Sequence, residues 1–272
     1  MKSLALVLLF ISLKGVCQDW EYLQVDSVYR MNHVKTCTVR FYGHEGSRIV
    51  FNFDCNGRVI DKVQFNSTGK TLYNRHKFAY NEKGKLAIVT YFTYWHLENN
   101  QIVEDSLPHP ASDWTTCILG YDSLDRLSHS LFTNLAGKVS GENTYTYNPF
   151  MLHSKIFSRI DSSTSTGIIF YDAPNVVKRY NSYREKAGKI IHNWDEEYDN
   201  SFDEKGRILK RKKTVPTDPG WGMEYSYEYD SKGLLMVLNS RRIDSKEDCS
   251  HKDLVYEYTF WDVNYVQTTV KR

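Results

Sequence analysis

The segment FDEKGR, residues 202–207, is one copy of a short phrase that recurs along the chain. Each copy has an aromatic residue, then Asp or Asn, two variable residues and a Gly. Asp or Asn accepts hydrogen bonds from backbone N–H groups further along the turn, and Gly supplies the positive φ that closes it with a bulge. The phrase therefore predicts tight hairpin turns with positive φ at its glycines. The clear copies are residues 53–58, 80–85, 202–207 and 229–233, with Gly57, Gly84, Gly206 and Gly233.

The sequence on either side of these turns has the period of a β-strand. Residues 225–229 read YSYEY and residues 144–147 read TYTY, so every second side chain is aromatic. Period-two alternation that ends in a Gly turn predicts β-hairpins. Leucines between residues 123 and 135 also recur at helical spacing, but we favour a strand because a turn phrase precedes them in register. Worn copies of the phrase occupy residues 121–126, 147–150 and 171–175.

These patterns predict one all-β fold, an antiparallel meander of repeated β-hairpins. We expect the sheet to be strongly twisted or curled, toward an open barrel or shell. Aromatic residues make up 14% of the chain, and they favour pleated, half-buried surfaces. Arrays of repeats need caps at their ends, and we expect residues 20–42 and 254–270 to be these caps.

The first 17 residues have the pattern of a secretory signal peptide. Lys2 precedes an apolar run, and small residues follow at Gly15 and Cys17. Lys14 and Val16 fit a lipid-attachment signal poorly, so we expect export without a lipid. We therefore predict a signal peptide over residues 1–17, a single β-repeat domain over residues 18–272, and a periplasmic, extracellular or cell-surface location without a membrane span.

The overall charge argues against nucleic acid as a partner. The chain has 35 Lys and Arg and 33 Asp and Glu, and removal of the signal peptide takes away two Lys. A protein without a basic surplus lacks the field that attracts polyanions. We read the basic run 210–213 as a solvated strand end.

No catalytic constellation emerges from the sequence, and we expect no enzyme activity, no cofactor and no metal. Phosphate-binding glycine loops and a nucleophile elbow are absent. His96, Asp105 and His109 share an extra loop at residues 96–115 and could form a zinc site, but we expect them to be solvated. The acidic run Asp195 to Glu197 could supply glycosidase carboxylates. Because consecutive strand residues point to opposite faces, we expect a solvated acidic turn there instead.

The cysteine pattern permits disulfides in an exported chain. Cys37, Cys55, Cys117 and Cys249 remain after the signal peptide, and no CxxC motif occurs. Cys37 and Cys55 are symmetric about Gly46, so a hairpin centred there would place them on one face within disulfide distance. We predict a Cys37–Cys55 disulfide. A Cys117–Cys249 bond would require the sheet to curl round and close.

The turn phrase, its spacing and the aromatic strands of residues 49–262 resemble the YD repeats of the Rhs family. The short form behind a signal peptide is similar to exported proteins of Bacteroidota. The resemblance implies a β-sheet shell. It does not imply a toxin, because the chain ends at Arg272 in strand-like sequence.

Taken together, these features predict a non-catalytic, exported scaffold or binding protein. Its partner is open and could be a glycan or another surface protein. Two alternatives remain: a glycan-active hydrolase with its site near residues 96–115, or a carrier that uses a concave apolar face of the sheet. The carrier would need a continuous apolar inner face.

Overall fold

The computed structural model describes most of the chain. The described residues are 26–41, 46–66, 68–69, 72–99, 101–107, 115–148, 151–158, 162–173, 176–243 and 251–261. Among them no helix is both long and apolar enough to cross a bilayer. The expected signal peptide, His109 and Cys249 lie outside the described residues.

The described residues form 18 strands that follow one another as an antiparallel meander, which confirms the predicted fold class. The strands are β1 (Val34–Phe41), β2 (Arg48–Phe53), β3 (Val59–Phe65), β4 (Leu72–Tyr80), β5 (Leu86–Thr93), β6 (Trp95–Glu98), β7 (Gln101–Glu104), β8 (Thr116–Tyr121), β9 (Leu127–Thr133), β10 (Val139–Asn148), β11 (Met151–Ser158), β12 (Ser163–Ala173), β13 (Val176–Lys186), β14 (Lys189–Phe202), β15 (Ile208–Val215), β16 (Asp218–Tyr229), β17 (Leu235–Arg242) and β18 (His251–Phe260). The leucine-rich segment is strand β9, as predicted.

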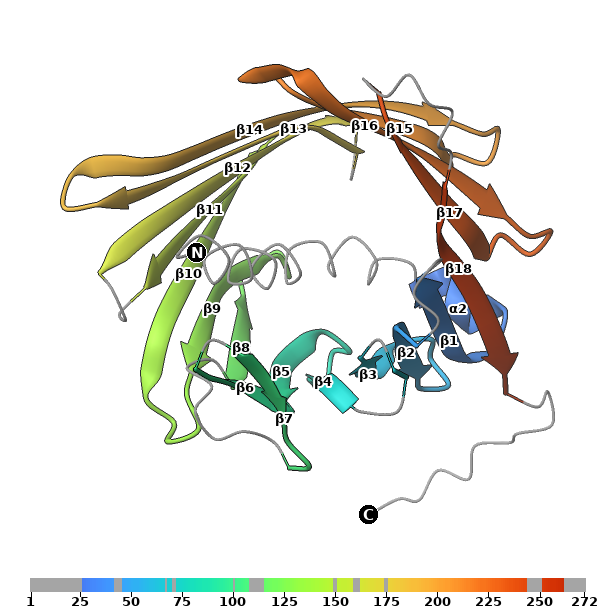
Figure 1. Ribbon diagram of the computed structural model, residues 1–272, viewed down its shortest axis with the longest axis horizontal. Coiled ribbons are helices and arrows are strands. Elements are labelled where there is room, and N and C mark those ends of the chain that lie inside the picture. The colour runs from blue at the N-terminus through green and yellow to red at the C-terminus, as the bar shows by residue number, and fades with distance from the viewer. Residues whose placement is uncertain are drawn as a thin grey trace.

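Sixteen of these strands close into a barrel, and Figure 1 looks into it. The barrel closes where β1 pairs with β18 over Val34 to Phe41, and the Thr36 and Thr259 hydroxyls share a 2.7 Å hydrogen bond across the junction. The expectation that the first and last segments cap an open array is therefore wrong. Each segment pairs with the unpaired backbone N–H and C=O groups of the other, so the closed sheet has no free edge there.

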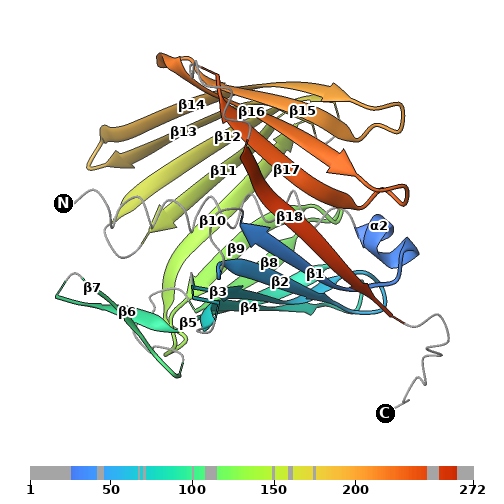
Figure 2. The ribbon, with the colours of Figure 1, turned by 45° about the vertical axis from the view of Figure 1, so that its right-hand side comes forward.

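The strands β6 and β7 form a separate two-stranded ribbon between β5 and β8. Figure 2 shows the ribbon projecting from one side of the barrel. At its base the Trp95 ring stacks on Tyr73, with 5.3 Å between ring centroids, and the Trp95 indole N–H donates to Asn74. This ribbon lies in the segment that the sequence marked as an extra loop.

The repeated phrase forms the same turn wherever the structure describes it. In the turn after β14, the Asp203 carboxylate accepts hydrogen bonds from the backbone N–H groups of Lys205 and Arg207, and Gly206 N–H donates to Asp203 C=O. Asp54, Asp122 and Asp230 make the same pattern. The φ angles are 76° at Gly57, 75° at Gly84, 76° at Gly206 and 86° at Gly233.

Another copy of the turn escaped the sequence analysis because Thr133 replaces the aromatic residue. Asn134 accepts from the N–H groups of Ala136 and Lys138, and Gly137 has φ of 74°. The remaining pattern of Asn, two residues, Gly and Lys is the signal that could have identified it.

Successive turns are linked through the arginine and the aromatic residue of the phrase. The Arg58 guanidinium lies over the ring of Tyr80, 4.7 Å from its centroid, and the Tyr80 hydroxyl donates to the Val59 carbonyl. Arg207 and Tyr229 repeat the arrangement at 4.6 Å, with a Tyr229 hydrogen bond to Ile208 C=O. The phrase therefore does more than form a turn, because its ends bind one hairpin to the next.

The helix α2 (Asp26–Met31) packs against one end of the barrel wall. Its Tyr29 ring lies 4.6 Å from Phe53 and 6.5 Å from Tyr258, measured between ring centroids. These rings extend the apolar cluster of β1, β2 and β18 across the helix.

Candidate binding site in the barrel interior

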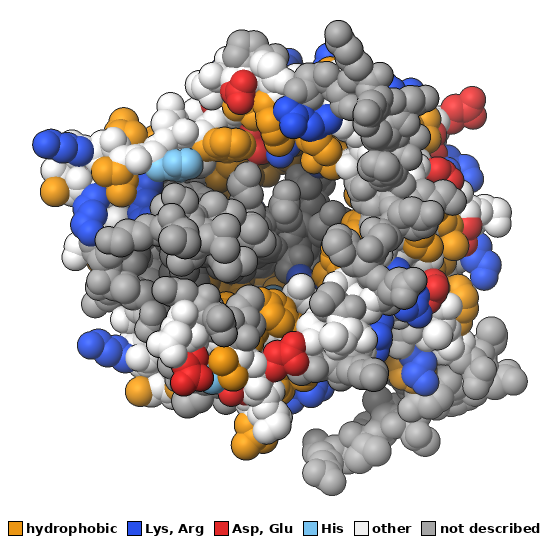
Figure 3. Space-filling model, in the orientation of Figure 1, with side chains coloured by type: hydrophobic (Ala, Val, Ile, Leu, Met, Phe, Trp, Pro, Cys, Tyr) orange, Lys and Arg blue, Asp and Glu red, His pale blue; other side chains and the backbone are white. Residues whose placement is uncertain are grey.

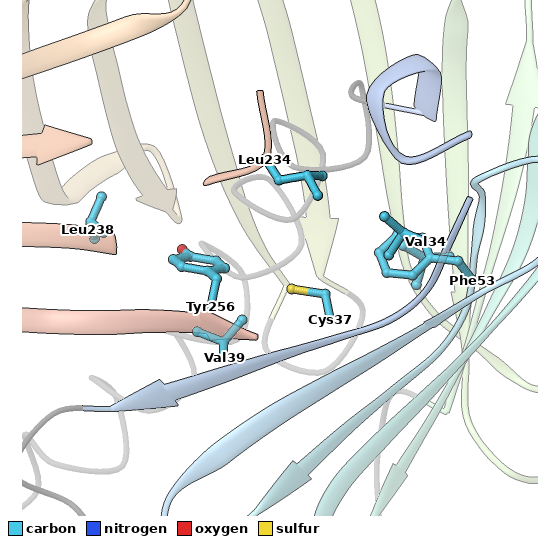
Figure 4. Close-up of a cluster of buried hydrophobic side chains, with 8 residues drawn as sticks. Val34, Cys37, Val39, Phe53, Leu234, Leu238 and Tyr256 are labelled. Carbon is cyan, nitrogen blue, oxygen red and sulfur yellow. The ribbon is translucent and has the colours of Figure 1, made fainter. Parts of the chain in front are cut away.

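The inward side of the sheet is identified by its buried side chains. Cys37 and Val39 of β1 and Tyr256 of β18 gather on the side that faces the opposite wall (Figure 4). They are 3%, 5% and 7% exposed. In antiparallel strands, directly opposed residues share a face, as do alternate residues of one strand. The strand register therefore shows which side chains of the whole barrel point inward.

The inward assignment is consistent around the complete ring. Cys37 lies opposite Tyr258 on β18 and opposite Phe51 on β2. Following opposed and alternate residues from strand to strand around the barrel, from Tyr258 to Phe51, leads back to the same face of Cys37. Each of the sixteen junctions contributes at least one inward pair. In order these are Cys37–Tyr258, Leu254–Leu238, Leu238–Tyr227, Tyr225–Arg211, Lys213–Tyr198, Trp194–Ser182, Tyr180–Ile169, Ile169–Leu152, Ser154–Tyr145, Asn143–Ser130, Phe132–Cys117, Cys117–Val89, Tyr91–His76, His76–Lys62, Lys62–Phe51 and Phe51–Cys37.

One arc of the interior is apolar. A first buried cluster spans β1, β2, β3, β17 and β18, and a second spans β5, β8 and β9. The half-buried Phe78 ring on β4 packs against both clusters and makes the arc continuous. The members with lowest exposure in the second cluster are Cys117 at 2% and Phe132 at 3%.

A histidine lies within this apolar arc. His76 meets the Tyr91 ring edge to face, with 4.8 Å between ring centroids. Burial, together with the charge of nearby Lys62, lowers the pKa of His76 to about 3. The side chain is therefore neutral at physiological pH and behaves as part of the apolar surface.

The facing arc, on β13 to β16, is polar and aromatic. The Glu196 carboxylate accepts hydrogen bonds from Trp194 Nε1 at 2.7 Å, from Lys213 Nζ at 3.0 Å and from the Tyr198 hydroxyl. Lys213 also lies 4.9 Å above the Trp221 ring. These residues form a buried ion pair whose hydrogen-bonding groups are held by aromatic side chains, an arrangement in which a charged pair tolerates burial.

The outward side has a different composition. Charged side chains stand in the middle of strands, and ion pairs join neighbouring strands on this face. The pairs are Arg40–Glu257 at 3.0 Å, Asp61–Arg75 at 2.9 Å, Arg179–Asp195 at 2.6 Å and Glu224–Arg241 at 2.9 Å. In the end view, hydrophobic side chains border the middle above and below, and many Lys and Arg side chains lie at the rim (Figure 3).

The outward face also has an apolar strip on β5, β8 and β9. Ile88 lies opposite Ile118, which lies opposite Leu131. Ile88 is 38% exposed and Ile118 is 43% exposed. The strip interrupts the charged surface.

The acidic run Asp195 to Glu197 is where the sequence expectation was partly wrong. It is not a solvated turn, because β14 continues through it and buries both Asp195 and Glu196. The expectation of opposite faces holds: Asp195 pairs with Arg179 on the outside, and Glu196 lies inside. The inward network was not predicted, although Trp194, Glu196 and Tyr198 alternate in one strand.

The expected zinc residues are only partly described. His96 Nδ1 and Asp105 Oδ2 are 2.9 Å apart on the β6–β7 ribbon, and His109 lies outside the described residues. Within the described part of the chain, no three His, Cys, Asp or Glu side chains come together as a metal site.

The predicted Cys37–Cys55 disulfide is absent. The hairpin register places Cys37 opposite Phe51, and Cys55 lies beyond the end of β2, inside the next turn. The hairpin centre is displaced from the assumed Gly46, which moves the two cysteines apart along the strands. Cys37 and Cys117 carry free thiols on the inward face, and burial raises the pKa of each thiol to about 12.

The comparisons with known proteins identify no relative by sequence: no family model and no curated protein matches the chain. Among solved structures, a porin-like protein from Bacteroides vulgatus has 10% identity and a TM-score of 0.48, over 84% of this chain and 98% of that one. A porin-like protein from Bacteroides uniformis has 11% identity and a TM-score of 0.34, over 83% and 98%. A chain of the TcdB2-TccC3-Cdc42 structure has 12% identity and a TM-score of 0.30, over 77% of this chain and 10% of that one. Likeness at these TM-scores does not bear on function.

Proposed function

We propose that this chain is a non-catalytic, exported binding protein that holds an apolar or amphiphilic ligand inside its barrel. The observation that carries the proposal is the distribution of side chains over the two faces. The register places two apolar clusters inside and cross-strand ion pairs outside. A carrier protein needs an apolar inner face to hold its ligand, and this distribution provides one.

The size of the barrel supports an interior ligand. Eight strands leave an interior that side chains fill or that holds one small ligand, whereas sixteen enclose a much wider lumen. The described core accordingly consists of two clusters along the wall and not of one central core. Ligand sites in proteins are mainly apolar with a few placed polar groups, as in this interior.

The outward face argues for water around the barrel. Membrane barrels present an apolar band to lipid, and a charge at mid-membrane depth destabilises them by about 2–4 kcal/mol. The exposed pairs Arg40–Glu257 and Glu224–Arg241 stand at outward strand positions of this barrel, on the face where a membrane barrel presents apolar side chains. We infer that the outer surface contacts water after export.

The predicted processing and organisation belong to the same proposal. Cleavage after Cys17 would release residues 18–272 as one domain into the periplasm or to the cell surface. The shared turn and the Arg–Tyr link between hairpins support a relation to the β-sheet of YD-repeat proteins.

The hydrolase alternative finds no support in the described residues. Glycoside hydrolysis uses two carboxyl groups on either side of the scissile bond. On the inward wall of β13 to β16, the buried Glu196 carboxylate already pairs with Lys213. On the β6–β7 ribbon, Glu104 binds Asn66, and Asp105 binds His96.

The proposal is tested by ligand binding to the exported form, residues 18–272. A fluorescent apolar probe such as N-phenylnaphthylamine should bind to saturation and be displaced by dodecanol. Phe78→Gln places an amide between the two clusters and should weaken binding about tenfold, from the loss of one aromatic contact surface. Ala79→Gln, on the outward face of the same strand, is the matched control and should bind normally.

Circular dichroism establishes that both variants fold. Saturable binding that responds to Phe78 and not to Ala79 supports an interior site. Absence of saturable binding, or equal loss in the two variants, would overturn the proposal.

A further inference from the structure

The tip of the β13–β14 hairpin exposes apolar surface. Ile190 is 66% exposed and Ile191 is 54% exposed, so the barrel wall covers neither side chain well. Pairing in the hairpin continues to its last pair, Lys186 with Lys189, and both residues of the turn between them have positive φ. The tip is therefore a regular, tight turn that presents two large apolar side chains to its surroundings.

This tip extends past the neighbouring strand. β14 pairs with β13 as far as Lys189, but its pairing with β15 covers only Glu197 to Phe202. The eight residues of β14 that precede Glu197 correspond to about 26 Å of strand. Figures 1 and 2 show the β13–β14 hairpin reaching beyond β15 at one end of the barrel. The tip is accordingly placed to contact a surface that approaches this end.

The outermost charges of the hairpin are positive. Lys186 and Lys189 lie opposite each other next to the turn, and both are exposed. The acidic residue of this segment, Glu185, lies opposite Ile190, one pair further from the turn. Basic and hydrophobic side chains gather where this hairpin lies, on the left of Figure 3. The apolar pair is thus bordered by lysines on the side of the turn.

A second turn at the same end has a similar combination on a smaller scale. β9 and β13 run in the same direction in the antiparallel meander, so the turns that follow them lie at one end of the barrel. In the β9–β10 turn, Leu135 is 58% exposed, and Lys138 is exposed as well. This end of the barrel therefore has two apolar tips, each with lysine nearby.

The chemistry of these tips fits a lipid surface better than an added β-strand. Exposed apolar side chains enter the boundary between head groups and acyl chains, and lysines beside them bind anionic lipids. Lysine at a strand edge and an irregular register are features that hinder pairing with another strand. Both occur here, because Lys189 lies on the edge and the register shifts by one residue at Ile191.

We propose that this end of the barrel docks on an anionic lipid surface, with Ile190 and Ile191 inserted among the head groups and Lys186 and Lys189 bound to lipid phosphates. The barrel wall stays in water, and only the tips contact lipid. The inference goes beyond the proposed function, since it concerns where the protein binds a membrane surface and does not require a ligand inside.

The test is co-sedimentation of residues 18–272 with large unilamellar vesicles. One set of vesicles is phosphatidylcholine alone, and the other contains about 30% phosphatidylglycerol. We expect about tenfold tighter binding to the anionic vesicles at low salt, and loss of this difference at high salt, because the lysines lie in water where salt screens them.

Matched variants locate the contact. Ile190→Ser combined with Ile191→Ser should weaken binding to anionic vesicles about tenfold, through the loss of inserted apolar surface. Ile88→Ser combined with Ile118→Ser makes the same change on the outward strip and should leave binding unchanged. Circular dichroism establishes that both variants fold.

The lysines are tested separately. Lys186→Gln combined with Lys189→Gln should bring the affinity for anionic vesicles close to that for neutral vesicles. Lys212→Gln, which removes a positive charge from the wall, should have little effect.

The opposite results are distinct. If the protein binds neither set of vesicles, or if the strip variant loses binding while the tip variant keeps it, docking through this hairpin is wrong. A smaller assembly in light scattering on changing Ile190 and Ile191 to Ser, without vesicle binding, would assign the tip to contact with a second copy instead. Binding of the fluorescent probe inside the barrel tests the proposed function independently of all these outcomes.

Discussion

The guanidinium of Arg207 lies over the ring of Tyr229, with Cζ 4.6 Å from the ring centroid, while Asp203 binds the same guanidinium at 2.6 Å. One arginine thus joins its own turn to the aromatic residue that starts the next turn phrase. The double-mutant cycle of Arg207→Met and Tyr229→Leu should give a coupling free energy of about 1 kcal/mol, since the pair is partly shielded from water. Chemical denaturation of the four proteins measures it. Strictly additive effects would show that the two side chains are neighbours without being energetically linked.

The turn phrase demands positive φ, and two positions test this in opposite directions. Gly206 has φ of 76°, so Gly206→Val should destabilise the protein by about 1–2 kcal/mol, through the strain of a β-branched residue there. Asp125 occupies the same turn position with φ of 58°, and Asp125→Gly should stabilise the protein by about 0.5 kcal/mol. Asp125 also faces Lys83, but that pair is exposed and contributes little. Thermal unfolding curves that shift in the same direction for both variants would be inconsistent with this account.

The buried ion pair should be structural. Glu196→Gln leaves the Lys213 charge buried without its carboxylate and should destabilise the protein by about 3 kcal/mol, whereas Glu196→Gln combined with Lys213→Met should be less harmful than the single change. The outward pair Glu224–Arg241 is the control, because Arg241 is half exposed and Glu224→Gln should cost less than about 1 kcal/mol. Equal effects of Glu196→Gln and Glu224→Gln would place Glu196 in contact with water.

His76 predicts a specific dependence of stability on pH. Burial lowers its folded-state pKa to about 3, whereas the unfolded chain takes up the proton near pH 6.5. Below pH 6.5 the unfolded state therefore binds more protons, and the free energy of unfolding falls by up to about 1.4 kcal/mol per pH unit until the folded-state pKa is reached. His76→Phe should flatten the curve between pH 6 and pH 4. An unchanged slope in His76→Phe would assign the acid sensitivity to other groups.

The local structure of this barrel was predictable because the residues within each turn specify that turn. Asp203 and Gly206 are sufficient to specify a turn within six residues, and the alternation of Tyr225, Tyr227 and Tyr229 specifies a strand. The sequence predicted that the sheet would curl, but it did not predict which strands would close the barrel. The closing pair, β1 with β18, joins segments more than 200 residues apart that share no motif.

The interior could not be read from the sequence for a related reason. Alternation shows that Glu196 and Asp195 point to opposite faces, but it does not show which face is inside. That assignment needs the register of every junction, and one residue of shift reverses it. The hairpin containing Cys37 illustrates this sensitivity: the assumed centre at Gly46 predicted Cys55 as its partner, and the register gives Phe51.

The most direct test of the account is the position of a bound ligand. We would crystallise residues 18–272 with 12-bromododecanoate and locate the bromine by anomalous scattering. The account predicts a bromine peak inside the barrel, in van der Waals contact with the inward apolar arc around Phe78 and Phe132. A peak on the outward strip of Ile88 and Ile118, with the interior closed to the ligand, would contradict it.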